Sequence, residues 1–200
     1  MSSLTSQAKY VERAQCMLDI FKKHGGDCEA PMELSDDVNY PAPLKALLLV
    51  CKEWHTLPSK EHYEVFGVNL FQDGHFLDKV QILSGGDEEY MNEWRTNEDH
   101  ETPNCAQDGW ECFGAMSEFD FLFVNIDPNS EHYGSTRRVV NNNFQDFPMT
   151  DTFHEFFGRL EGFSREWHGQ DIDERDVLFN FRRSSRYRRP PVRYGKSVQK

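Results

Sequence analysis

Three stretches of the chain repeat apolar residues at helical spacing. In residues 6–24 they recur every three or four positions, and two glycines follow as a stop signal. Residues 44–54 form a shorter, mostly apolar run. The clearest period lies in residues 151–167, where the stripe consists of Phe153, Phe156, Phe157, Leu160, Phe163 and Trp167. These stretches predict three helices, and a further short helix is predicted to begin at Ser59 after a Leu-Pro break.

Two glycines interrupt the stripe of the predicted helix 151–167. Gly158 and Gly162 each cost about 1 kcal/mol in a helix interior. Because both stand between phenylalanines, we expect them to allow close packing of this helix against the sheet.

A period of two residues predicts the strands. Residues 119–127 are the best example, because apolar side chains occupy both faces of the pleat. One face carries Leu122, Val124 and Ile126, and the other carries Phe121, Phe123 and Asn125. We therefore expect a central strand that is covered on both sides.

Further strands are predicted on either side of this central one. Residues 136–142 predict the next strand, with Val139 and Val140 facing inward. Residues 76–83 alternate well enough to predict an earlier strand. Asp127 is expected to cap the polar turn that precedes Gly134.

Two acid-rich stretches lack a regular period. Residues 27–43 contain three prolines and predict a loop. Residues 85–109 predict a long loop with a helical turn at 87–94. Since the helices flank the strands instead of alternating with them, the sequence predicts an α+β fold with a mainly antiparallel central sheet, N-terminal helices and a C-terminal helix.

Charge divides the chain into an acidic body and a basic tail. The formal net charge is −12, yet residues 182–200 contain eight basic residues and no acidic one. Residues 1–181 therefore hold 34 acidic and 14 basic residues, a net charge of −20. We expect one domain over residues 1–181 and a disordered tail over 182–200. An acidic body attracts basic proteins and repels nucleic acid, so nucleic acid is expected to bind only through the tail.

The residue types of metal and catalytic sites do not assemble into a known pattern. The spacing Cys105-x6-Cys112 fits no standard zinc site, even with His75 and His100 as additional ligand types, so we expect no metal and no other cofactor. Asp120 and Asp127 are seven residues apart on a strand and face opposite sides. We therefore expect no enzyme activity. Five irregularly spaced cysteines predict reduced thiols and a cytoplasmic location.

Neither a membrane span nor a signal peptide is expected. The chain has no run of about 18 apolar residues. The first residues lack a basic segment followed by an apolar one.

Three groups of residues follow one another in an order that one family shares. The first is Leu57-Pro58 with Tyr63 and Phe66, followed by Asp73-Gly74; the second is Phe113-Gly114 before the strand ending at Asp127; the third is Gly134 and Val139 before Phe153, Phe156 and Leu160. Over roughly residues 44–165 this order resembles the SUKH superfamily, whose bacterial members are mostly toxin-neutralising immunity proteins. The acidic stretch 85–109 and the basic tail depart from the usual pattern.

The resemblance implies a protein that binds and blocks a cognate toxin, for which a basic nuclease is one candidate. We expect the toxin to bind an acidic surface made of Asp87, Glu88, Glu89, Glu93, Trp94, Glu98, Asp99 and Glu101. A core position for Trp94 or Trp110 remains an open alternative, as does a solvated loop without a partner.

The same superfamily includes a fungal cell-wall regulator and herpesvirus proteins, so a regulatory scaffold or a viral host-interaction protein is the alternative function. In that case the tail would bind nucleic acid or an acidic partner. The tail residues concerned are Arg182, Arg183, Arg186, Tyr187, Arg188 and Arg189.

Overall fold

The computed structural model describes residues 2–23, 27–28, 30–34, 39–55, 78–96, 105–117, 120–140 and 145–166. The elements in chain order are α1 (Ser2–Lys23), β1 (Asp27–Cys28), α2 (Ala42–Val50), β2 (Trp54–His55), α3 (Lys79–Ser84), α4 (Glu88–Thr96), β3 (Trp110–Ser117), β4 (Asp120–Asn125), β5 (Thr136–Val140), β6 (Gln145–Thr150) and α5 (Phe153–Glu166).

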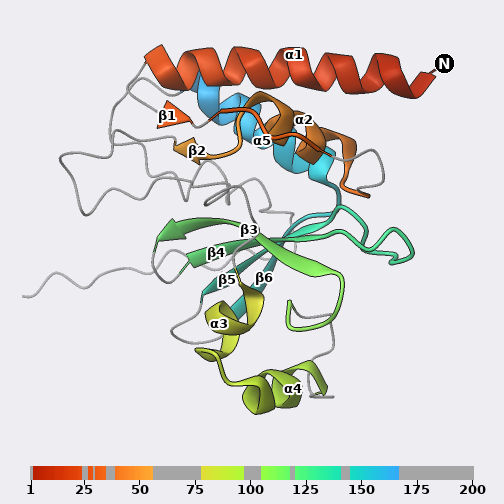
Figure 1. Ribbon diagram of the computed structural model, residues 1–200, viewed down its shortest axis with the longest axis vertical. Coiled ribbons are helices and arrows are strands. Elements are labelled where there is room, and N and C mark those ends of the chain that lie inside the picture. The colour runs from red at the N-terminus through yellow and green to blue at the C-terminus, as the bar shows by residue number, and fades with distance from the viewer. Residues whose placement is uncertain are drawn as a thin grey trace, which may run out of the picture.

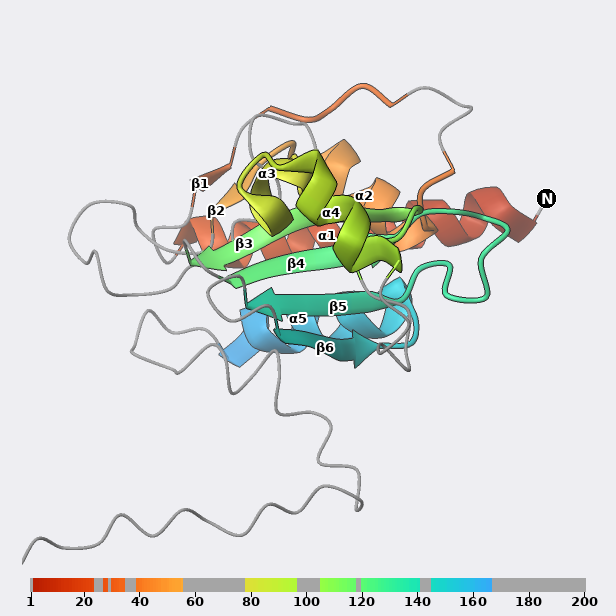
Figure 2. The same ribbon diagram turned by 90° about the horizontal axis from the view of Figure 1, so that it is seen from below.

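A four-stranded sheet lies between two layers of helices. Its order is β3-β4-β5-β6, and every neighbouring pair is antiparallel. Helices α1, α2 and α5 lie on one side of the sheet, and α3 and α4 lie on the other (Figure 1). Figure 2 shows α3 and α4 in front of the sheet and α1 and α5 behind it. The prediction of an α+β fold with a mainly antiparallel sheet, N-terminal helices and a C-terminal helix is confirmed.

Strand β4 belongs to two hydrophobic cores, as its sequence predicts. Leu122 and Val124 belong to the core beneath α1, α2 and α5, whereas Phe123 belongs to the core beneath α3 and α4. All three side chains are fully buried. The period of two residues therefore assigned the faces of β4 correctly, and the prediction of a strand covered on both sides is confirmed.

The aromatic stripe of α5 fills the larger core. Phe153, Phe156 and Phe157 are buried, together with Leu160 and Phe163. Phe113 of β3 makes edge contacts with two of these rings, at centroid distances of 5.2–5.3 Å. Such aromatic pairs add about 0.5–1.5 kcal/mol each beyond area burial. Trp167, the last residue of the predicted stripe, lies outside the described residues.

Other predicted helices agree with the structure at shifted boundaries. The helix expected at 6–24 is α1, which already begins at Ser2. The helix expected at 44–54 is α2, which ends at Val50, and Trp54 lies in β2. The loop expected at 27–43 contains β1, which pairs with β2. The short helix expected at Ser59 lies outside the described residues.

The strand predicted at 76–83 is wrong, because Lys79–Ser84 form the helix α3. Asp78 caps this helix, and its Oδ1 accepts hydrogen bonds from the backbone N–H groups of Val80 and Gln81 at 2.9 and 3.3 Å. Gly85 ends the helix in a left-handed conformation, with a φ of 67°. An N-cap aspartate and a C-terminal glycine therefore outweigh the alternating apolar residues of this stretch.

Two strands of the four-stranded sheet, β3 and β6, were not predicted from the sequence. In β3 the register shifts between Cys112 and Gly114, which breaks the simple alternation. In β6 Pro148 lies inside the strand, where it is tolerated because β6 is at the edge of the sheet. The helical turn expected at 87–94 is a full helix, α4, which extends to Thr96.

The expectation for the two glycines of α5 is also wrong. A Cβ atom added at Gly158 or Gly162 would meet nothing within 4 Å. These glycines therefore do not permit a close approach to another element among the described residues.

Candidate functional site

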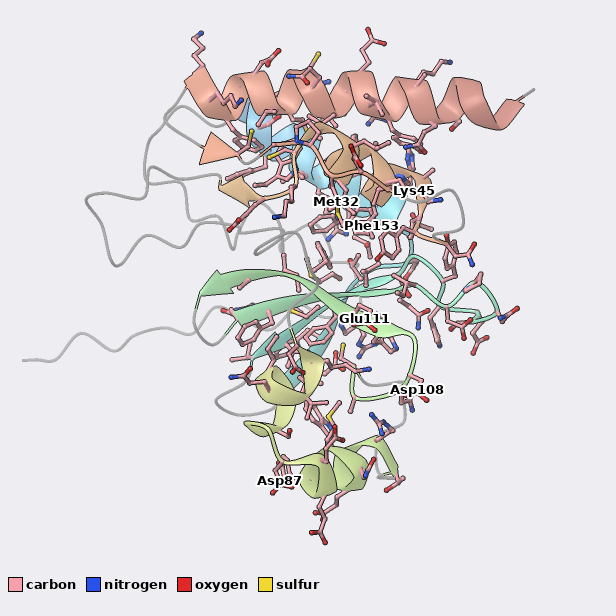
Figure 3. The ribbon with its side chains drawn as sticks, in the orientation of Figure 1. Met32, Lys45, Asp87, Asp108, Glu111 and Phe153 are labelled. Carbon is pink, nitrogen blue, oxygen red and sulfur yellow. The ribbon has the colours of Figure 1, made fainter. Side chains whose placement is uncertain are left out.

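Helix α4 presents an acidic face at the far side of the molecule from α1. Its first turn is capped by Asp87, whose Oδ1 accepts hydrogen bonds from Glu89 N and Tyr90 N at 3.0 and 3.2 Å. Asp87, Glu88, Glu89 and Glu93 are exposed. Figure 3 shows Asp87 at the end of the molecule opposite α1. We call these four carboxylates, together with Tyr90, the α4 acidic surface.

The opposite side of α4 faces the smaller core. Met91 and Trp94 are buried against Cys105, Trp110 and Phe123. Tyr90 is 39% exposed and directly follows Glu89 in the chain. Glu89 and Glu93 are four positions apart and lie on the outer side, whereas Glu88, three positions before Met91, is exposed at the edge of the buried side.

Trp94 does not belong to this surface. Its side chain is only 7% exposed and packs in the smaller core, so the prediction that it contacts a partner is corrected. Trp110, the other tryptophan considered, is buried as well. Glu98, Asp99 and Glu101 lie outside the described residues, as do the six tail residues from Arg182 to Arg189.

Arg95 points away from the acidic surface. Its Nε donates a hydrogen bond to the carbonyl oxygen of Ala106 at 3.0 Å, and an Nη1 hydrogen bond of 2.7 Å reaches Asn92 Oδ1. The Nε atom also lies 3.8 Å from a carboxylate oxygen of the exposed Asp108. Arg95 is therefore directed to the loop before β3, and within the described part of the chain it does not neutralise the carboxylates of the α4 acidic surface.

A buried polar cluster lies on the side of the sheet that faces α3 and α4, and no pattern in the sequence predicted it. Arg137 of β5 is paired with Asp146 of β6, and each side chain is 10% exposed. The Arg137 guanidinium carbon lies 5.8 Å from the centroid of the Trp110 ring. Asp146 also accepts a hydrogen bond from Cys105 N at 3.0 Å. Antiparallel pairing of β5 with β6 brings these charges together, and no spacing in the sequence indicates that register.

Two half-buried charged groups lie where α3 meets the sheet. Burial raises the pKa of Glu111, and the nearby positive charge of Lys79 opposes this rise. Burial likewise lowers the pKa of Lys79, whose Nζ donates to the carbonyl oxygen of Gln107 at 2.9 Å. Figure 3 places Glu111 on β3, between the two helical layers. Neither residue was among the sequence-based candidates.

The carboxylates first considered for catalysis have structural partners. Asp120 accepts two hydrogen bonds from Arg138, at 2.6 and 2.7 Å. Asp127 accepts from Asn129 N at 2.9 Å, so it caps its turn as expected. His154 is exposed, and its Nδ1 lies 2.7 Å from Tyr10 Oη.

The thiols and the metal-ligand types give no chemical centre within the described chain. None of the five cysteines forms a disulfide, and three of them, Cys51, Cys105 and Cys112, are buried. Burial raises the pKa of each of these three thiols. Among the described residues, no three His, Cys, Asp or Glu side chains are grouped to hold a metal ion. His75 and His100 lie outside that part of the chain.

Comparison with known proteins adds no assignment. No protein-family model matches the chain, and no curated protein is significantly similar to it. In the described part of the chain, none of the helices has the length and apolar character needed to cross a membrane. The structure thus shows an α+β protein with an exposed acidic helix face and a buried polar cluster.

Proposed function

We propose that this chain is a non-enzymatic protein-binding module that contacts a basic partner through the α4 acidic surface. The observation that carries the proposal is the side-by-side exposure of Glu88, Glu89 and Glu93 on a helix whose other side is buried. In line with the resemblance to the SUKH superfamily, the proposed partner is a cognate toxin that the chain neutralises by covering its active site. A basic nuclease has the complementary charge.

Electrostatics supports a partner of positive charge. Like charges at neighbouring helix positions destabilise the isolated helix by about 0.2–0.5 kcal/mol per pair. A cationic partner would relieve this repulsion on binding. Complementary charge also accelerates association, and the acceleration falls as salt screens the charges over about 8 Å at physiological ionic strength. Tyr90 supplies an aromatic side chain of a type that is enriched at interfaces.

The structural partners of Asp120 and Asp127 support a binding role over a catalytic one. Both carboxylates hold local structure, one by an ion pair with Arg138 and the other by capping a turn. A cytoplasmic location is part of the proposal, since five cysteines that form no disulfide suit a reducing compartment.

The test is an affinity capture from the native host with the wild-type chain and a variant carrying Glu88→Lys, Glu89→Lys and Glu93→Lys. The matched control carries Glu12→Lys, Glu33→Lys and Glu131→Lys, which changes the net charge equally at exposed positions outside α4. We expect one stoichiometric basic protein to be retained by the wild type and the control and lost by the α4 variant. Equal retention by all three chains contradicts the proposal.

A truncated chain of residues 1–181 completes the test. Retention of the same protein by this truncation assigns binding to the body. Loss of the partner, or loss of co-purifying nucleic acid, on truncation instead favours the alternative in which the basic tail dominates.

A further inference from the structure

The loop of residues 105–109 connects α3 and α4 to the sheet. From α3, Lys79 Nζ donates to the carbonyl oxygen of Gln107 at 2.9 Å. From α4, Arg95 Nε donates to the carbonyl oxygen of Ala106 at 3.0 Å. Two adjacent carbonyl groups of one loop therefore receive a charged side chain from each helix.

The loop is in turn fixed to the sheet at both of its ends. At one end, Cys105 N donates to Asp146 Oδ2 at 3.0 Å. At the other end, Ile126 N donates to the carbonyl oxygen of Gly109 at 2.7 Å. The side-chain anchor is Asp146, which lies on the edge strand β6 and is 41 residues away from Cys105 in the chain.

Asp146 divides its two carboxylate oxygens between the loop and the sheet. Oδ1 accepts from Arg137 Nε, and Oδ2 accepts from Cys105 N. Charge-assisted hydrogen bonds of this kind are roughly twice as strong as neutral ones, and burial of both side chains reduces screening. The Trp110 ring lies against Arg137 and limits its orientation further.

The apolar contacts of α4 do not fix its position in the same way. Met91 and Trp94 pack in the smaller core, but the hydrophobic effect is non-directional. Hydrogen bonds have strict distance and angle requirements. Asp146 holds Cys105 of the loop to the sheet, and the next residue, Ala106, accepts the hydrogen bond from Arg95 of α4. These directional contacts therefore constrain where α4 lies on the sheet.

We propose that Asp146 is a positioning residue for the α4 acidic surface, acting from the opposite edge of the sheet through the loop of residues 105–109. This role rests on the proposed function, because it takes the exposed carboxylates of α4 to be the partner-binding face. The positioning itself is a property of the free protein and is measured without a partner.

The experiment is backbone hydrogen exchange of the full chain carrying Asp146→Ala, read by mass spectrometry of its peptides. Losing the charged anchor should raise exchange in residues 88–96 and 105–110 by about tenfold or more. Exchange in α5, which packs on the other face of the sheet, should stay at the wild-type rate.

The matched control is Asp120→Ala. It removes a partly buried ion pair, Asp120 with Arg138, that joins β4 to β5 in the same sheet. We expect this variant to leave the exchange of residues 88–96 unchanged. Raised exchange of α4 in both variants, or in neither, overturns the proposal.

A conservative variant separates positioning from a general loss of stability. In Asp146→Asn, the single side-chain oxygen accepts from Cys105 N or from Arg137 but not from both through separate oxygens. Exchange of α4 should therefore lie between the wild type and the alanine variant. If Asp146→Ala does not fold, the asparagine variant carries the test alone: a rise confined to residues 88–96 and 105–110 supports the proposal, and a uniform rise across all elements contradicts it.

The two proposals can fail separately. In one case, exchange of α4 rises in Asp146→Ala, but the wild type and the α4 charge-reversal variant retain the partner equally. This result would support the role of Asp146 and contradict the proposed function. Unchanged exchange of α4 in Asp146→Ala, with the partner lost by the α4 charge-reversal variant, would support the proposed function and contradict the positioning role of Asp146.

Discussion

Arg13 of α1 and Glu161 of α5 lie 148 residues apart in the chain and are joined by two hydrogen bonds. Arg13 Nε donates to Glu161 Oε1 at 3.2 Å, and Arg13 Nη2 donates to Oε2 at 2.8 Å. The guanidinium carbon also lies 4.9 Å from the centroid of the Phe157 ring. One arginine thus connects two helices of the larger core by charge and by aromatic contact.

Glu161→Gln should destabilise the protein at pH 7 by about 1 kcal/mol, because the pair is partly exposed to solvent. The hydrogen bond from Arg13 lowers the pKa of Glu161 below its ordinary value of 4.5. The contribution of the carboxylate is therefore present above pH 4.5 and is lost as the pH falls through the lowered pKa of the folded state. Urea unfolding at pH 7 and at lower pH should show the difference between variant and wild type narrowing. A constant difference across this range would contradict the assignment.

Glu111→Gln should stabilise the protein at pH 7, raising the melting temperature by roughly 1–2 °C, since the half-buried side chain keeps part of its solvent contact. Burial raises the pKa of Glu111, so the folded state disfavours its charged form. The stability associated with the protonated carboxyl is complete below the unfolded pKa of about 4.5 and is lost as the pH rises through the raised pKa. Thermal unfolding should show the two proteins converging in acid. The control is Glu33→Gln at an exposed position, and a lower melting temperature of Glu111→Gln at pH 7 would refute the prediction.

Gly109→Ala should destabilise the protein by about 2 kcal/mol or more, through backbone strain and overpacking together. Gly109 has a φ of 82°, and a Cβ atom there would lie 2.8 Å from Asp127 Cβ. Gly85→Ala is the matched control, because its φ is 67° but no atom lies within 4 Å of the added Cβ. We expect the control to cost only about 1 kcal/mol, the strain term alone. Equal free energies of unfolding for the two variants would show that the close approach to Asp127 has no effect.

Trp94→Ala should destabilise the protein by about 3–5 kcal/mol, as expected for removing a large buried aromatic side chain. Tyr90→Ala, on the exposed side of the same helix, should change the free energy of unfolding by about 0.5 kcal/mol or less. Denaturant unfolding of both variants tests whether the structure assigns the two faces of α4 correctly. A small effect of Trp94→Ala would return this tryptophan to the candidates for partner contact.

The sequence predicted those elements whose side chains repeat at one regular period. The stripe of α5 and the two faces of β4 follow from burial alone, so periodicity was sufficient for them. Helix α3 was misread as a strand, because Val80 and Ile82 fit an alternating pattern while the capping by Asp78 decides the outcome. Strand β6 was missed because Pro148 and the exposed Phe147 obscure its pattern.

The acidic character of α4 was visible in the sequence, whereas its support was not. Glu88, Glu89 and Glu93 are exposed, in agreement with the expected acidic surface. The pair Arg137–Asp146, which we propose positions α4, depends on how β5 aligns with β6. A register is a property of two strands together, and the composition of each strand does not reveal it.

The contact between α1 and α5 has a consequence for how the chain acquires its structure during synthesis. Helix α1 is the first described element to leave the ribosome, and α5 is the last. Helix α1 can pair early with α2, but Phe21 meets Phe163 only after the six described strands have been made. Contacts of such sequence separation slow folding, and the apolar side of the α1–α2 pair stays uncovered meanwhile. Any binding of chaperones to the nascent chain should therefore last until translation has produced α5.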